Sequence, residues 1–494
     1  MSGKPTVPST GPDPAGKPTL KRALGLRMAL VIVIGNVIGS GIFLKPGAIA
    51  GEAGHFGLII SVWAFGGVLC VLGALCFAEL ATMLPRAGGL YVYLREAYGR
   101  PVAFLLGWME LLLSRPASLG ALSAAFVGSL TLALDWRTSQ LTELVLILTL
   151  IGGMAWVNII GVIWGARVQM VTTLIKGIAL GLMAAVPILL VPFTSVGIEL
   201  ANYASTAVPR QTGLASQLGV VLLAVMWAYD GWHGITPLTE EVRNPQRVIP
   251  RALFGGVGIL IILYLSANFA YHGVMTMGEM KAAGDHVAEE MLRKLLGPFG
   301  VTLMSAVIMC SVFGGINSTL LQAPRVTFAM GRDGVFFRSL GRVHAKYRTP
   351  AVAIFVKAIL GMALVIIVVV TKSLVREVNI DSYDSRTMFL IIESLQNDSI
   401  FSLLTNMVIF AASIFYALGV LAVIVLRYRL PQQERPFKTP GYPLVPLAFV
   451  LVYVWFLYQT FTDKPLESLV GILLIILGIP IYYAYQWATA AGRE

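Results

Sequence analysis

Charged residues are scarce in this sequence. Asp, Glu, Lys and Arg make up 12% of its 494 residues, whereas hydrophobic residues make up 57%. A soluble globular protein carries about 25% charged residues. The mean hydropathy of +0.80 agrees with this shortage of charge. The composition therefore excludes an ordinary soluble protein and indicates an integral membrane chain.

The sequence is also poor in cysteine and histidine, with three and five residues. Cys70, Cys76 and Cys310 all lie in apolar runs, and the histidines are scattered along the chain. Neither a disulfide framework nor the ligand spacing of a metal site is present. We expect no metal, no cofactor and no enzymatic activity, since catalysis needs a cluster of such groups. A repeated filter loop or ring of charge, as a channel needs, is not apparent either.

Long apolar runs are abundant and recur from end to end. A membrane-spanning helix needs about 20 apolar residues. This length predicts twelve spans. They cover residues 24–51, 57–83, 101–131, 142–162, 168–193, 214–240, 251–275, 298–330, 350–371, 400–427, 443–462 and 466–488.

Basic residues predict the orientation of these spans. The formal net charge is +11, and Lys and Arg concentrate in alternate loops, for example around Arg243 and Arg342. Such sorting follows the positive-inside rule, so we expect a multi-pass protein of the cytoplasmic (inner) membrane with both termini in the cytoplasm. The same rule accounts for the positive charge without a nucleic-acid partner. Residues 1–21 and 489–494 are expected to be cytoplasmic tails, the first of them disordered.

The first span is interrupted in its middle by Gly39, Ser40 and Gly41. Glycine in a helix costs about 1 kcal/mol relative to alanine. A break also leaves backbone N–H and C=O groups unpaired, which costs several kcal/mol in lipid unless protein, water or a ligand satisfies them. The break is therefore either a kink or a ligand site.

A second interruption lies in the sixth span, where Asp230 precedes Gly231. An acid at this depth costs at least about 2.5 kcal/mol and marks a functional position by default. Breaks in the first and sixth spans fit a 5+5 inverted repeat with the substrate between the paired breaks. We therefore predict an all-α integral membrane fold of 12 transmembrane helices with discontinuous helices 1 and 6. Its single transporter domain covers 22–488, with repeat one at 24–193, repeat two at 214–427 and two C-terminal helices at 443–488.

Six motifs, in order, resemble those of the L-type amino acid transporters of the amino acid, polyamine and organocation superfamily. The resemblance covers roughly residues 22–488. The motifs are 35–43 (GNVIGSGIF), 73–80 (GALCFAEL), 108–116 (WMELLLSRP), 227–232 (WAYDGW), 239–245 (TEEVRNP) and 434–438 (ERPFK).

The resemblance implies a site for a zwitterion. It places the substrate carboxylate on the backbone N–H groups of Gly39, Ser40 and Gly41, where free amides suit an anion. It places the substrate ammonium on carbonyls at the ends of the two half-helices. The residues at those ends are Ile38, Trp227, Ala228, Asp230 and Gly231.

Three of the implied roles concern single side chains. Trp227 stands at the position of the aromatic gate, although an ordinary core tryptophan is the alternative. Asp230 has three open roles, which are contact with the substrate amine, pairing with a cationic side chain, and acceptance of hydrogen bonds from neighbouring backbone. Lys176 matches the lysine that replaces sodium in sodium-independent relatives, with Asn317 and Ser318 as neighbours on the eighth span.

Several other charges at depth match family positions without a defined role. Glu79, Glu110 and Arg115 fit structural pairing or a network on the cytoplasmic side as well as substrate contact. Lys357 is expected to extend toward the membrane interface. Glu240, Glu241 and Arg243 lie at the inner end of the sixth span. Pairing with basic residues of the first or eighth span would make them an intracellular gate, a hypothesis with equal weight for and against.

Together these features predict a secondary amino acid transporter working by alternating access, most simply as a sodium-independent exchanger of neutral L-amino acids. The alternatives are a proton-coupled symporter and an exchanger that accepts cationic amino acids through Asp230. The expected partners are the amino acid and the lipid bilayer. The loop 132–142 lacks the cysteine that links eukaryotic members to a glycoprotein, so no disulfide-linked heavy subunit is expected.

Overall fold

The computed structural model describes residues 22, 24–86, 88–160, 163–190, 197–209, 213–332, 344, 349–380 and 384–491. This part of the chain is helical and contains no strand beyond two isolated bridges, Leu24 with Val242 and His55 with Thr206.

The helices follow one another with short connections. In chain order they are α1 (Leu26–Val37), α2 (Gly41–Leu44), α3 (Pro46–Ala53), α4 (Phe56–Met83), α5 (Leu90–Tyr98), α6 (Arg100–Met109), the π-helix η1 (Glu110–Ser114), α7 (Arg115–Ala133), α8 (Gln140–Ile160), α9 (Ile163–Leu190), the 3₁₀-helix η2 (Leu200–Ala204), α10 (Leu214–Tyr229), the 3₁₀-helix η3 (Thr236–Glu241), α11 (Pro245–Val274), α12 (Met277–Ala283), the 3₁₀-helix η4 (Gly284–His286), α13 (Val287–Leu296), α14 (Pro298–Arg332), α15 (Ala351–Val375), α16 (Arg386–Asn397), α17 (Ile400–Arg429), α18 (Leu444–Asp463) and α19 (Pro465–Ala491).

Eleven helical segments of the described residues are long and apolar enough to cross a membrane. The predicted sixth span is represented by the shorter α10, because the helix ends at Tyr229, where the sequence break begins. The predicted third span is one continuous run, α6–η1–α7, with a π-helical turn at Glu110–Ser114 that the sequence did not reveal. The all-helical, many-span fold predicted from the sequence is thus confirmed.

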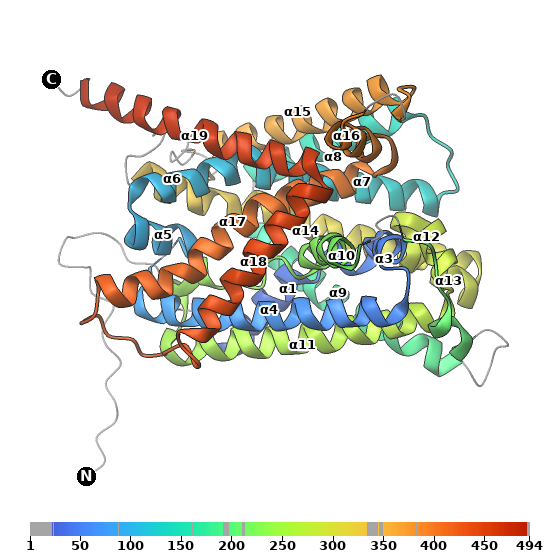
Figure 1. The fold of residues 1–494 in the computed structure, drawn as a ribbon, viewed down its shortest axis with the longest axis horizontal. Helices are drawn as coiled ribbons and strands as arrows, with labels where there is room; N and C mark the ends of the chain where they lie inside the picture. Colours follow the sequence, from blue (N-terminus) through green and yellow to red (C-terminus); the bar gives the residue numbers. More distant parts are fainter. Residues whose placement is uncertain are drawn as a thin grey trace, which may run out of the picture.

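The long helices lie side by side around α1 and α10 (Figure 1). Short helices cover the two ends of this bundle. One end carries α5 and is called the α5 end below; the opposite end carries α12, α13 and α16 and is called the α16 end (Figure 1). The breaks in the first and sixth spans lie inside the bundle, away from both ends.

A belt of apolar side chains faces outward on the long helices. Leu174 on α9 is 65% exposed and Leu451 on α18 is 68% exposed. Water disfavours such a surface, whereas lipid tails do not. The belt is therefore the surface that the bilayer covers.

The packing decides two local environments. Most side chains of α5 are buried against the bundle, and Tyr98 Oη donates to Leu418 O at 2.9 Å. Lys357 does not extend to an interface, since it is 3% exposed inside α15. In both cases the side chains are buried by neighbouring helices, and the sequence alone does not show which helices pack together.

Glu79 ties the C-terminal helices to the bundle. Its carboxylate accepts two hydrogen bonds from the Arg427 guanidinium, at 2.9 and 2.7 Å, and one from the backbone N–H of Thr439 at 2.7 Å. The guanidinium also lies over the Tyr442 ring, 3.8 Å from its centroid. Of the alternatives left open for Glu79, structural pairing is the one found.

Replacing Glu79 with alanine should lower the free energy of unfolding by about 3 kcal/mol, because it leaves the Arg427 charge unpaired in a mostly buried place. Thermal unfolding of the purified protein in detergent measures the effect. Glu96→Ala is the matched control, since Glu96 pairs with the largely exposed Arg86. Equal melting temperatures for the two variants would contradict this role for Glu79.

Candidate functional site

The first break exposes three backbone amides to the interior of the bundle. Helix α1 ends at Val37, Ile38 is extended, and α2 begins at Gly41. Among the described residues, no partner is recorded for the N–H groups of Gly39, Ser40 and Gly41. Buried amides without partners are rare in proteins, so their position favours a ligand.

The second break begins where α10 ends. Asp230 leaves the helix with φ −58° and ψ 145°, and Gly231 follows in the left-handed region with φ +91°. A side chain at Gly231 would also press on the carbonyl of Asn36, 3.0 Å from its Cβ. Glycine is required here for both reasons.

The two breaks touch each other. A Cβ atom on Gly41 would overlap the Cα atom of Ala228. The Tyr264 hydroxyl lies within hydrogen-bond distance of Val37 O (3.0 Å) and Ala228 O (2.9 Å), so it bridges the last carbonyls of both first half-helices. The close approach fixes the two sets of free backbone groups relative to one another.

A cavity of about 170 Å³ lies beside the paired breaks and reaches toward the α5 end, where Gly88, Leu90 and Tyr91 line it. Of the residues predicted for the site, eight line this cavity: Gly39, Ser40, Gly41, Trp227, Asp230, Gly231, Lys176 and Ser318. Ile38, Ala228 and Asn317 lie outside its lining. The resemblance assigns the Ala228 carbonyl to the substrate ammonium. This oxygen lies 2.9 Å from the Tyr264 hydroxyl, so one of its two lone pairs is left for a second hydrogen bond.

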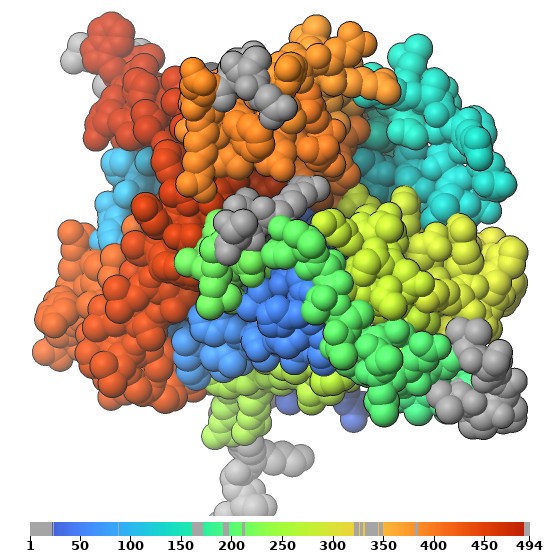
Figure 2. All heavy atoms as spheres, turned by 45° about the vertical axis from the view of Figure 1, so that its right-hand side comes forward, coloured from blue at the N-terminus to red at the C-terminus, as the bar shows by residue number. Residues whose placement is uncertain are grey.

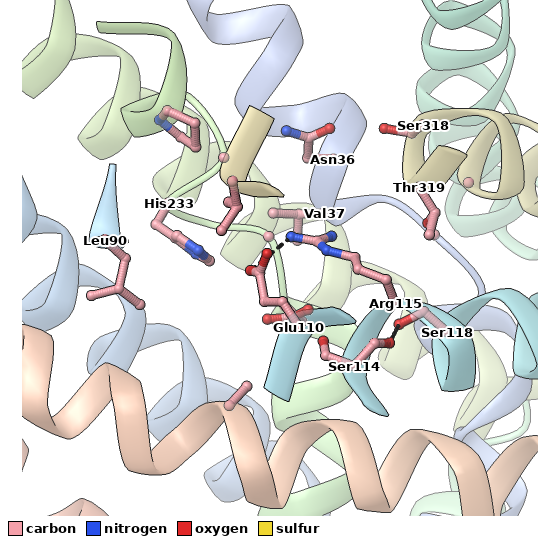
Figure 3. Close-up of a pocket in the computed structure, with 18 of the residues that line it drawn as sticks. Asn36, Val37, Leu90, Glu110, Ser114, Arg115, Ser118, His233, Ser318 and Thr319 are labelled. Carbon is pink, nitrogen blue, oxygen red and sulfur yellow. Dashed lines mark hydrogen bonds and ion pairs between the residues drawn. The ribbon is translucent and has the colours of Figure 1, made fainter. Parts of the chain in front are cut away.

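A polar wall, formed by Glu110, Arg115 and His233, closes one side of the cavity (Figure 3). Arg115 and Glu110 form an ion pair at 3.1 Å across the π-helical turn η1. The widened turn brings both side chains to the cavity, as π-bulges at functional sites often do. Glu110 Oε2, Arg115 Nε and His233 Nδ1 are buried without hydrogen-bond partners. This wall therefore retains unused capacity to bind a polar group.

Asp230 has a partner that the sequence did not suggest. Its Oδ1 accepts a hydrogen bond of 2.6 Å from the Tyr416 hydroxyl on α17. Tyr416 also lines the cavity and contacts the His233 ring, with the centroids 4.9 Å apart. Nothing in the sequence marked Tyr416, whereas His233 was detectable as the polar residue nearest the second break.

Lys176 is 1% exposed and lies at the cavity on α9, which packs against α1 and α14. Thr173 Oγ1 approaches Gly35 on α1, and Thr172 Oγ1 approaches Gly314 on α14. Ser318 and Gly315 on α14 line the same cavity as Lys176. Lys176 thus occupies the space between the first and eighth spans, away from either interface.

Two aromatic rings separate the cavity from the α16 end. Trp227 Nε1 donates to Ser40 Oγ at 3.2 Å, and its indole meets the Phe401 ring edge to face, with centroids 6.1 Å apart. On the far side of Phe401 lies a second cavity of about 530 Å³. Phe401 is a wall residue that the sequence analysis missed, because a phenylalanine at a span start carries no distinguishing pattern.

The 239–243 segment is hydrogen-bonded to residues just before α1, mostly through backbone groups. Leu24 N donates to Glu241 O at 3.0 Å, Arg243 N donates to Leu24 O at 2.8 Å, and Arg243 Nε donates to Arg22 O at 3.3 Å. The contact holds η3 against the start of α1 at the α5 end.

Comparison with known proteins gives matches over nearly the whole chain. A family model described as amino acid permease matches residues 24–484. The serine/threonine exchanger SteT of Bacillus subtilis (strain 168) is 31% identical over 472 residues, which are 94% of this chain and 97% of that protein. The human Asc-type amino acid transporter 1 is 30% identical over 476 residues, covering 96% and 84% of the two chains. The rat b(0,+)-type amino acid transporter 1 is 29% identical over 483 residues, covering 96% and 91%.

Replacing Gly41 with alanine should weaken binding of L-amino acids by about tenfold or more, because the added methyl group forces the two breaks apart. Gly39→Ala is the matched comparison and should cost less, since its Cβ would meet only Val37 O, at 3.7 Å. Ligand-induced thermal stabilisation across the common L-amino acids measures both. A larger loss in the Gly39 variant would refute the geometry.

Proposed function

This chain belongs to the amino acid permease family, and on that premise we propose that it moves neutral L-amino acids across the cytoplasmic membrane by sodium-independent exchange. The observation that carries the proposal is the pairing of two helix breaks at one cavity, with free amides on one of them. The family consists of transporters rather than enzymes, and amino acid transport is its common activity.

The paired breaks suit a zwitterion. The N–H groups of Gly39, Ser40 and Gly41 form the anion side, on which the substrate carboxylate binds. The carbonyl oxygens at the C-terminal ends of α1 and α10 form the cation side, on which the substrate ammonium binds. They belong to Ile38, Trp227 and Ala228. One amino acid then satisfies both sets of backbone groups, which are costly to leave unpaired in a membrane interior.

The position of Lys176 supports sodium independence. Its ammonium is a fixed cation between the first and eighth spans, near Ser318 and with Asn317 on the same helix α14. A sodium ion bound in that space would face the lysine charge at close range, and like charges repel strongly in a low-dielectric interior. The lysine therefore replaces the ion as a stabiliser of the break.

The cavity's shape fits one state of an alternating-access cycle. It reaches the α5 end, while Trp227 and Phe401 block the α16 end. Trp227 is the proposed gate. Basic residues near α5 and in the 239–251 segment favour the cytoplasm for the α5 end by the positive-inside rule. Both termini are then cytoplasmic, and the repeats at 24–193 and 214–427 move relative to each other around the site.

No disulfide-linked heavy subunit belongs to this proposal. Residues 132–142 contain no cysteine, and Cys70 and Cys76 are buried inside α4. The lipid bilayer and the amino acid are the proposed partners.

A second candidate is exchange of cationic amino acids, favoured by the placement of Asp230 in the cavity lining. A lysine or arginine side chain reaching Asp230 would meet a carboxylate that holds one hydrogen bond from Tyr416. The neighbouring Arg115 charge acts against such a ligand.

Purified protein in liposomes should take up labelled serine or another neutral amino acid faster when unlabelled amino acid is inside, with equal rates in sodium and choline buffers. Empty liposomes and liposomes carrying the Gly41→Ala variant are the controls. A strict sodium requirement would refute the role of Lys176. Uptake driven by a pH gradient without internal amino acid would replace exchange with proton-coupled symport.

Replacing Asp230 with asparagine should lower the ratio of arginine to serine exchange by about tenfold, if cationic substrates are accepted, because a charged hydrogen bond is lost. Tyr416→Phe is the matched variant: it keeps the carboxylate, frees its Oδ1 and should raise the same ratio. Competition of unlabelled amino acids against labelled serine gives the ratio. If arginine does not compete with labelled serine in the parent or in either variant, exchange of cationic amino acids is eliminated.

A further inference from the structure

Lys45 is a buried lysine just beyond the first break. It follows α2 directly, five residues after Ser40, and is 1% exposed. Burying an ammonium is expensive unless partners compensate for the lost water. The resemblance and the proposed site leave this residue without a role.

The partners of Lys45 come from the α16 end. Its Nζ lies 3.3 Å from Ser402 Oγ and 5.0 Å from the centroid of the Phe401 ring. The charges of Asp285 in η4 and Asp398 before α17 also act on it. Asp398 is held in turn by Lys464, whose Nζ lies 2.7 Å from its Oδ2. Two segments, η4 and the start of α17, therefore surround the ammonium over Phe401.

These contacts complete a ring that begins and ends on the first span. Ser40 accepts a hydrogen bond from Trp227, Trp227 packs against Phe401, and Phe401 lies under Lys45. Four residues connect the amide site, α10 and α17 in one closed chain of contacts. Removing any member leaves the rings that separate the two cavities without part of their support.

We propose that Lys45 is the positioning residue of a two-ring gate, formed by Trp227 and Phe401, that closes the α16 end of the transport path. Phe401 belongs to this gate as the partner of Trp227. The inference rests on the proposed function, since a gate matters for a transporter, and it adds a residue whose position depends on the amide site.

The coupling follows from the length of α2. Only Ile42, Phe43 and Leu44 lie between Gly41, the last amide of the first break, and Lys45, so a ligand that fixes these amides also fixes the ammonium. When α2 is in this position, the cation lies over the Phe401 ring and holds it against Trp227 by a cation–π contact. When α2 moves, Phe401 loses that contact and the ring pair can separate. Binding at the break is thereby linked to closure.

The larger cavity gives the gate its direction. Phe401 lines this 530 Å³ cavity together with Asp285 and His286, and Trp227 lines the central one. Figure 2, in which the right-hand side of Figure 1 comes forward, shows a blue, N-terminal part of the chain bordered by green segments. An amino acid arriving from the α16 end reaches Phe401 before it reaches the breaks.

Cysteine accessibility tests the gate directly. Ser118→Cys places a reporter in the central cavity of a chain whose Cys70, Cys76 and Cys310 are replaced by alanine. A membrane-impermeant maleimide is added outside intact cells, and labelling rates are compared. Lys45→Met should label about fivefold faster than the parent, as expected when a cation–π contact no longer favours the closed gate. Phe401→Leu should do the same.

Two matched variants separate gating from a general loss of structure. Lys45→Arg keeps the cation and should restore slow labelling, while Lys281→Met removes an exposed lysine bonded to Val208 O and should label like the parent. Melting temperatures of all variants are measured in detergent. If Lys45→Met does not fold, the Phe401→Leu result decides.

Unchanged labelling in both Lys45→Met and Phe401→Leu overturns the proposal, as does faster labelling in Lys281→Met. The labelling is measured without amino acid, so it reports closure even if the exchange assay fails. If exchange fails while Lys45→Met and Phe401→Leu label faster as expected, the proposed function is refuted and the gate proposal stands. Normal exchange with unchanged labelling would refute the gate and keep the function.

Discussion

The structure depends on one constraint, which is that unpaired backbone groups are expensive inside a membrane. Helices α1 and α10 stop in mid-bundle and leave amides and carbonyls free. The Tyr264 hydroxyl lies within hydrogen-bond distance of one carbonyl of each helix and has one proton to donate between them, and the close contact of Gly41 with Ala228 excludes other side chains from the junction. What remains unpaired supports the proposed site, because a zwitterion has both charges needed to satisfy it.

The surrounding helices hold these breaks in place with polar contacts that lipid never reaches. Asp230 is anchored on Tyr416 from α17, and the π-helical turn before α7 presents Glu110 and Arg115 to the same cavity. At the α5 end, Glu79 binds Arg427 at the end of α17 and Thr439 in the connection to α18. Buried charges are costly alone, so Glu79 and Asp230 each have a partner from another span, whereas Glu110 and Arg115 pair within one span.

Closure of the α16 end combines aromatic packing with one buried cation. Trp227 comes from the helix before the second break, Phe401 from α17 and Lys45 from the chain after the first break. The elements that carry the site are thus the elements that carry the barrier. This arrangement links occupancy of the site to access without a separate signalling element.

The sequence by itself determined the class of fold and the two breaks, and it marked eight of the residues that line the cavity, because hydropathy, glycine and isolated charges are local signals that the bilayer makes strict. It anticipated Gly39, Ser40, Gly41, Trp227, Asp230 and Lys176 at one cavity. Only the tertiary structure decided that Tyr416 holds Asp230, that Tyr264 joins both breaks, that Lys357 is buried, and that Phe401 and Lys45 lie beside the gate. Those contacts join residues far apart in the sequence, and the hydrogen bond of Lys45 with Ser402 beside them spans 357 positions. Their geometry is set by how the helices pack, which no local pattern records.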